Sequence, residues 1–192
     1  MKTIVLSVLA LLFLSSGFSQ DSLPPHLIGK IKYPAVNIHQ YSGVINVEYN
    51  AMKYDSSIDY KIVIDVYDKI KDSTKILSPI IEVSRIYNLN VANGVPKEKL
   101  HMAAVVHYLA VHAILSDEEY KKKFGIANPN AKAVKKLKEL GVNFYVCGQN
   151  LGMFNMTKDQ LLPEIEVALS AKNALITLDQ RGYTYMDVNE DQ

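Results

Sequence analysis

Apolar and polar positions along the chain predict an alternation of strands and helices. Three early segments are apolar at most positions, which is typical of strands buried on both faces of a sheet. The first of them, near 61–66, is also rich in β-branched residues. A later segment alternates apolar and polar residues, as half-buried strands do. We expect five core strands, near residues 61–66, 101–106, 142–147, 164–168 and 183–186.

The segments between these strands carry the spacing and the end signals of helices. Apolar residues recur every three or four positions, and capping residues stand before several of these runs. Ser78, Ser116 and Ser170 are expected N-caps, and Thr157 opens a capping box for a short helix that Pro163 ends. The longer helices are expected over 79–93, from Ser116 toward Phe124, over 129–140, and from Ser170 to Gly182.

Regular alternation of strands and helices predicts the fold class. It implies an α/β domain of doubly wound, flavodoxin-like type, with a mostly parallel five-stranded sheet between helices. We place this domain at residues 60–187. Residues 20–59 have weaker patterning and are expected to wrap the domain as an N-terminal extension, and residues 188–192 to form a disordered tail.

Residues 1–19 have the layout of a cleaved secretory signal. Lys2 is followed by an almost unbroken apolar run to Leu14 and then by small residues at Gly17 and Ser19. This run is too short to span a bilayer, which needs about 20 residues, and no similar run follows. We therefore expect a periplasmic or secreted protein that is not inserted in a membrane after cleavage. The alternative is an N-terminal anchor that stays uncleaved.

Charge and cysteine content narrow the class of partner. The net charge is +1, and Lys2 is the only charged residue of the signal, so the remaining chain is neutral. A neutral domain has no electrostatic attraction for nucleic acid or anionic lipid. Cys147 is the only cysteine, so no internal disulfide can form. A lone thiol in an oxidising compartment is buried, paired with another molecule, or used chemically.

Chemistry-bearing residues gather where the predicted strands end. Asp65 follows the first strand, His107 the second, and Cys147, Gly148 and Gln149 the third. If the strand order is 2-1-3-4-5, these ends are neighbours, and a thiol, an imidazole and a carboxylate could share one cleft. This predicts Cys147 as a nucleophile assisted by His107, in a cleft lined by Asp65, Gly148 and Gln149, with the sulfur accessible to solvent.

A different interpretation of the same residues stays open. Free cysteine is among the most buried residue types, and a lone histidine is often structural. The chain would then be a non-catalytic oligomeric module that binds a small ligand or a metal ion, with Met153 and Met156 near Cys147 as soft ligands. No GxGxxG, Walker A, GxSxG or HExxH motif is present, so no enzyme class is assigned and no cofactor is expected.

The string Gly-Val-Asn-Phe-Tyr-Val-Cys-Gly-Gln, residues 141–149, resembles the DsrE/DsrF-like family, in particular its exported branch. Further likeness lies in Val105-Val106-His107, in 120–130, in 167–171 and in 180–183, so that the resemblance covers about residues 60–187.

The resemblance implies a function and an assembly. In the best-understood members of this family, a cysteine after the third strand carries a persulfide in a sulfur relay, and Cys147 matches that position. His107 matches a family histidine to which the resemblance assigns no role. Homo-oligomers, trimers or hexamers, are implied, together with a partner protein that donates or accepts sulfur.

Overall fold

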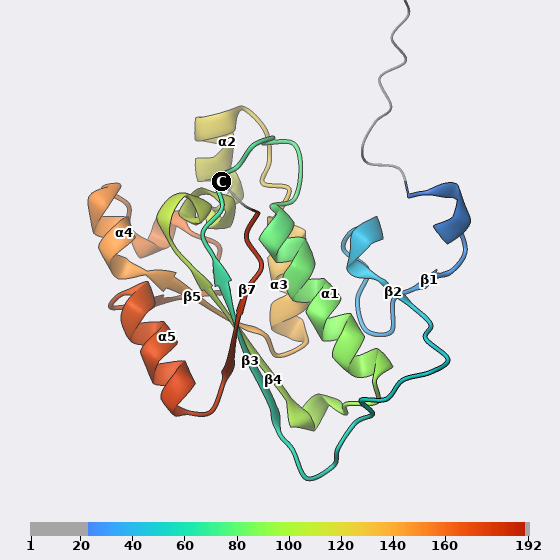
Figure 1. Ribbon diagram of the computed structural model, residues 1–192. Helices are drawn as coiled ribbons and strands as arrows, with labels where there is room; N and C mark the ends of the chain where they lie inside the picture. Colours follow the sequence, from blue (N-terminus) through green and yellow to red (C-terminus); the bar gives the residue numbers. More distant parts are fainter. Residues whose placement is uncertain (1–22, 191–192) are drawn as a thin grey trace, which may run out of the picture.

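A parallel sheet of five strands forms the centre of the computed structural model, which describes residues 23–190 (Figure 1). All four pairings between neighbouring strands are parallel. The fold class expected from the sequence is therefore confirmed. The strands are β3 (Tyr60–Val66), β4 (Leu100–Val106), β5 (Asn143–Cys147), β6 (Ile165–Ala168) and β7 (Thr184–Asp187).

The strand order differs from the one considered above. Across the sheet it is β6-β5-β4-β3-β7, which in core numbering is 4-3-2-1-5 rather than 2-1-3-4-5. The second core strand, β4, thus lies between the first and the third. The ends of β3, β4 and β5 are still neighbours, but the strand that delivers His107 stands between those that deliver Asp65 and Cys147.

This order decides which helices cover which face. Three successive crossovers step in one direction, from β3 to β6, and the last returns to β7 beside β3. Since parallel crossovers are right-handed, the final helix must cover the face opposite to the others. In Figure 1, α1 and α3 lie on one side of the sheet and α5 on the other, with α2 above the carboxyl ends of the strands. The helices are α1 (Ser78–Ala92), α2 (Asp117–Phe124), α3 (Ala131–Glu139), α4 (Gly148–Met153) and α5 (Ala171–Gln180).

Two of the five α-helices in residues 23–190 begin with a capping serine. The hydroxyls of Ser116 and Ser170 accept hydrogen bonds from the backbone N–H groups of Glu119 and Asn173, as N-caps do. Ser78 is not a cap, because α1 begins one residue earlier than expected and Leu77 occupies that position.

Some elements were not expected from the sequence. The chain after β4 turns into a 3-10 helix, η4 (Tyr108–Ile114), and α4 follows β5 without a linker. The segment expected to form a short helix after Thr157 is a single 3-10 turn, η5 (Lys158–Gln160). A further turn, η3 (Lys97–Lys99), leads into β4.

Two apolar clusters hold the layers together. The larger lies between the sheet and the helices α1 and α3, and includes Ile64, Val83, Met102, Leu137 and Phe144. The smaller lies on the opposite face, under α5, and its buried members are Val63, Ala103, Val105, Cys147, Ala171 and Leu178. The second face has less apolar cover because a single helix crosses it.

Residues before β3 form an extension that lies along α1. It holds two short antiparallel strands, β1 (Ile31–Lys32) and β2 (Val44–Ile45), and the turns η1 (Pro25–Leu27) and η2 (Gln40–Ser42). Asn88, buried on α1, fixes the extension: its amide accepts hydrogen bonds from the N–H groups of Ala35 and Val36 and donates to the carbonyls of Val36 and Ser42.

The expectations for the N-terminal and the C-terminal end of the chain have different outcomes. The expected signal over residues 1–19 lies outside the described residues. The expected disordered tail does not apply to residues 188–190, because Asn189 and Glu190 make side-chain and backbone hydrogen bonds to the end of β3 and the loop after it. Within residues 23–190, no helix is long and apolar enough to cross a membrane.

Candidate functional site

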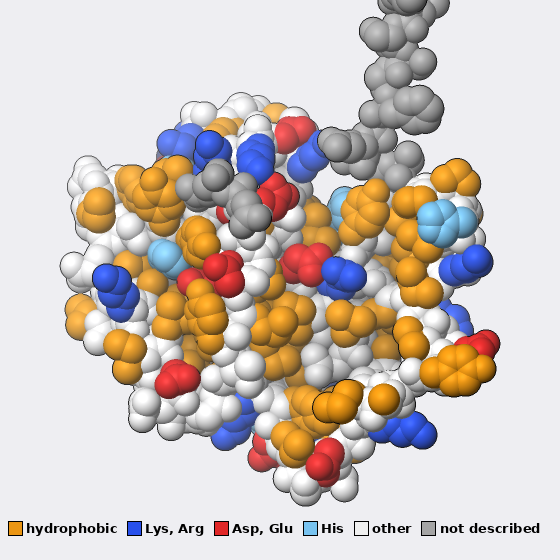
Figure 2. All heavy atoms as spheres, in the orientation of Figure 1, with side chains coloured by type: hydrophobic (Ala, Val, Ile, Leu, Met, Phe, Trp, Pro, Cys, Tyr) orange, Lys and Arg blue, Asp and Glu red, His pale blue; other side chains and the backbone are white. Residues whose placement is uncertain are grey.

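A buried carboxylate lies at the centre of a polar cluster at the carboxyl edge of the sheet. Asp65, near the end of β3, is only 6% exposed. Its Oδ1 lies 2.9 Å from Nε2 of His107, which follows β4, and its Oδ2 accepts a 2.9 Å hydrogen bond from the hydroxyl of Tyr185 on β7. Three strands thus contribute one side chain each. Figure 2 shows a histidine beside acidic side chains in this region.

The hydrogen bonds define the state of the imidazole. An ionised carboxylate only accepts, so its partners must both donate. We therefore assign the proton of neutral His107 to Nε2, which leaves Nδ1 as the acceptor. Nδ1 has no hydrogen-bond partner among the described residues, and the side chain is 26% exposed. His107 is thus an oriented base with its free nitrogen directed away from Asp65.

Tyr185 stays a donor in this arrangement. Partial desolvation of its hydroxyl, and then the hydrogen bond to the carboxylate of Asp65, raise the pKa of the phenol well above its ordinary value, although much of the ring is exposed. The hydroxyl therefore remains protonated at any physiological pH. Tyr185, Asp65 and His107 form a chain in which each proton has one defined acceptor.

The C-terminal segment closes the cluster from the side. The Tyr67 ring packs against His107 with centroids 5.4 Å apart, and its hydroxyl donates to Oδ2 of Asp187 at 2.9 Å. Asn189 donates to the backbone carbonyl of Asp65 and to Oδ1 of Asp187. Hydrogen bonds from Asn189 are the main cause that lowers the pKa of Asp187, so this second carboxylate is ionised near neutral pH.

Cys147 lies beside His107 but is less accessible than the sequence predicted. Val106 pairs with Val146 in register, so the next residues, His107 and Cys147, end neighbouring strands side by side. Both side chains lie on the face that α5 covers, since Cys147 belongs to the cluster of Val105. However, Cys147 is buried, at 6% exposure. The expectation of a solvent-accessible sulfur was wrong, because α5 and its Ala171 cover this end of β5.

The first turn of α5 is the second feature near the thiol. Ser170 caps this helix, and Ala171, its first residue, packs in the same cluster as Cys147. A helix carries partial positive charge at its N-terminus. The N-terminus of α5 thus lies next to the apolar cluster that holds the side chain of Cys147.

Gly148 and Gln149 fasten the end of β5 to β6. A Cβ added to Gly148 would stand 2.8 Å from the backbone oxygen of Ala168, so only glycine allows this approach. The amide of Gln149 donates to the backbone oxygen of Leu169 at 3.2 Å. Gly148 and Gln149 therefore contact the neighbouring strand. Of the five site residues expected from the sequence, the structure brings together Asp65, His107 and Cys147.

Three members of the cluster were not expected from the sequence. Tyr185, Asp187 and Asn189 stand at alternate positions of the last strand and its extension. Alternate residues of a strand share one face, so the spacing Tyr-x-Asp-x-Asn was the signal that could have found them.

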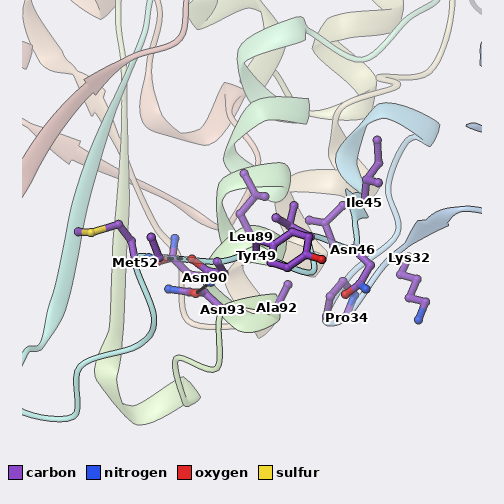
Figure 3. Close-up of a pocket in the computed structure, with 14 residues that line it drawn as sticks. Lys32, Pro34, Ile45, Asn46, Tyr49, Met52, Leu89, Asn90, Ala92 and Asn93 are labelled. Carbon is purple, nitrogen blue, oxygen red and sulfur yellow. Dashed lines mark hydrogen bonds between the residues drawn. The ribbon is translucent and has the colours of Figure 1, made fainter.

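The polar cluster coincides neither with a metal-binding group of side chains nor with the hollow beside the N-terminal extension. Among residues 23–190, no group of three or more His, Cys, Asp or Glu side chains could hold a metal ion. A hollow of about 680 Å³ lies between the extension and the last turns of α1, lined by residues such as Lys32, Tyr49 and Asn93 (Figure 3). Since α1 runs away from the carboxyl edge, this hollow is remote from His107 and Cys147.

Comparison with known proteins agrees with this architecture. The protein MTH1491 from Methanobacterium thermoautotrophicum, a solved structure of unknown function, is similar with a TM-score of 0.51 and 20% sequence identity; the match covers 67% of this chain and 99% of that one. At that identity the likeness concerns the fold alone. No curated protein matches.

A family model adds the stronger result. The sequence model of the DsrE/DsrF-like family matches residues 80–188, which is more than half of the chain and includes β4, His107, Cys147 and all of β7. The chain therefore belongs to the DsrE/DsrF-like family.

Proposed function

We propose that this protein handles sulfur through Cys147, which takes up a sulfane sulfur as a persulfide and passes it on. The observation that carries the proposal is the register of β4 and β5. It puts Cys147 next to His107, whose ring is held by the buried carboxylate of Asp65. A nucleophile, a base and a group that orients the base are the parts that activated nucleophiles share.

In the proposed reaction, His107 supplies the thiolate. Only thiolate attacks sulfur, so a proton must leave Cys147. Nδ1 of His107 accepts it, and Asp65 stabilises the resulting imidazolium. Cys147 is only 6% exposed. The molecule that donates sulfur to it, or accepts sulfur from it, must therefore be small or must present its sulfur on a narrow chain.

The test compares persulfide loading in three variants. Loading from inorganic polysulfide should be abolished by Cys147→Ser. Asp65→Asn should slow it at least tenfold, because a neutral amide no longer stabilises the imidazolium that forms when His107 takes up the proton. Asp179→Asn, an exposed carboxylate on α5, is the matched control and should load at the wild-type rate. Equal loading of Asp65→Asn and wild type would contradict the role of His107.

A non-catalytic binding module with a structural cysteine is the second candidate. The burial of Cys147 in an apolar cluster favours it. In that case native Cys147 reacts with iodoacetamide only after unfolding, and Cys147→Ser lowers stability because it places a hydroxyl among apolar side chains. Fast labelling of the native protein with little loss of stability in Cys147→Ser would exclude this candidate.

We also propose export and self-association. Export is supported by the pattern of residues 1–19 alone, and a homo-oligomer by the family resemblance. Several apolar side chains around α5 are exposed in the single chain, namely Val167, Leu169, Ile176 and Tyr185, and their burial in an assembly would stabilise it.

A further inference from the structure

A groove remains on the face of the sheet that α5 crosses. Strands lie about 4.8 Å apart and a helix is about 10 Å wide, so one helix cannot cover five strands. On the side of β5 and β6 this leaves a groove of about 280 Å³. Its floor includes Tyr145 and Glu166, which are paired in register, and α5 forms its wall.

The wall carries polar groups at helical spacing. Asn173, Thr177 and Arg181 stand four residues apart, so they share one side of α5, and all three line the groove. The guanidinium of Arg181 has no carboxylate partner among the described residues, whereas Glu166 is paired with Lys138 at 3.0 Å. One end of the groove therefore has an unbalanced positive charge, which suits a carboxylate.

The other end of the groove lies beside the strand end that carries Cys147, whose side chain packs under the first turn of α5. Ala168, which lines it, pairs with Cys147 in register, and Tyr145 precedes Cys147 by two residues on the same face of β5. From Ala171 to Arg181 the helix rises about 15 Å, the length of an extended chain of about four residues. A ligand that reaches from Arg181 to Cys147 is thus the size of a short peptide.

We propose that this groove binds a peptide-like thiol of low molecular mass, with its terminal carboxylate on Arg181, and that its persulfide is the sulfur donor to Cys147. This inference rests on the proposed function. The thiolate of Cys147 attacks the outer sulfur of the bound R–S–SH. A new S–S bond forms on Cys147 as the donor's S–S bond breaks, and the released R–S⁻ takes up the proton that Cys147 gave to His107. The products are Cys147–S–SH and R–SH.

Binding is tested first, without the reactive sulfur. Reduced glutathione, a tripeptide thiol, is titrated by calorimetry into the Cys147→Ser protein. We expect saturable binding that weakens at least tenfold when Arg181→Gln is added and less with Arg181→Lys, which keeps the charge but loses the bidentate geometry. Lys172→Gln, exposed on the same helix outside the groove, is the matched control. Equal affinity in Arg181→Gln and Lys172→Gln overturns the site, provided that thermal unfolding shows both variants folded.

Transfer is tested second, with two donors. Arg181→Gln in the otherwise wild-type chain should slow loading of Cys147 from glutathione persulfide at least tenfold and leave loading from inorganic polysulfide unchanged. If glutathione persulfide and inorganic polysulfide each load the wild type and Arg181→Gln at equal rates, the groove is not the donor site, although the proposed function stands. If neither donor loads the wild type, the proposed function fails and the transfer step with it, while the titration still decides whether the groove binds the thiol.

Discussion

His112 shows how a single side chain can set a pH dependence. It lies on η4 with its ring 5.4 Å from that of Phe154, and its Nδ1 is buried without a hydrogen-bond partner. Burial, and secondarily the charge of Lys123, lower its pKa below the ordinary value of 6.5. The folded protein therefore keeps His112 neutral at pH values where the unfolded chain already binds a proton.

We predict that acidification destabilises the protein through this residue. Stability is full above the unfolded pKa of 6.5 and falls as the pH drops from there toward the lowered folded pKa. His112→Phe keeps a ring against Phe154 but cannot titrate, so it should remove this part of the pH dependence. It should also raise stability at pH 7 by about 1 kcal/mol, because an unsatisfied buried nitrogen is removed.

Urea unfolding at pH 7.5 and pH 5 measures both effects. His26→Leu, on the exposed turn η1, is the control and should keep the wild-type dependence. An unchanged pH dependence in His112→Phe would show that another group is responsible.

At the scale of elements, the join between β5 and β6 depends on one glycine. A Cβ on Gly148 would lie 2.8 Å from the oxygen of Ala168 and 3.3 Å from that of Leu169, both backbone atoms that cannot move away independently. Gly148→Ala should therefore push α4 from β6 and cost about 1–3 kcal/mol of stability.

The same helix offers the matched control. A Cβ on Gly152 meets nothing within 4 Å, so Gly152→Ala should be neutral or stabilise α4 by up to about 1 kcal/mol. The urea denaturation midpoints of Gly148→Ala and Gly152→Ala test this prediction. Equal midpoints would mean that the close approach at Gly148 is not required.

The extension and α1 are joined through Asn88. This buried side chain makes four hydrogen bonds to residues 35–42, so Asn88→Ala leaves their backbone groups unpaired. We predict faster proteolysis within residues 23–59 while the sheet stays folded. Asn90→Ala, which removes a bond within α1 only, should leave the cleavage rate unchanged. Equal protection in both variants would show that other contacts hold the extension.

At the scale of the whole molecule, a homo-oligomer is expected. Light scattering at micromolar concentration should give a mass several times that of one chain, three or six times if the assembly follows the family resemblance. Ile176→Lys, on the exposed side of α5, should lower that mass, because it places a charge among the apolar side chains available for burial. A wild-type monomer under these conditions would contradict the prediction.

The sequence by itself determined the elements and the class of fold. Strands such as β4 and helices such as α2 are encoded by neighbours along the chain: a run of apolar residues for the strand, and a serine cap and a glycine after the last turn for the helix. These signals are local, so pattern alone places them to within a few residues. The same patterns located Cys147 and His107 at strand ends.

Only the tertiary structure decided the strand order and the environment of the thiol. Asp65 meets His107 across 42 residues and Tyr185 across 120, and no local pattern encodes such pairings. The burial of Cys147 depends on α5, which reaches it because the last crossover returns to the far side of β3. Burial and partners depend on which distant elements pack together, because they result from the sum of many long-range contacts.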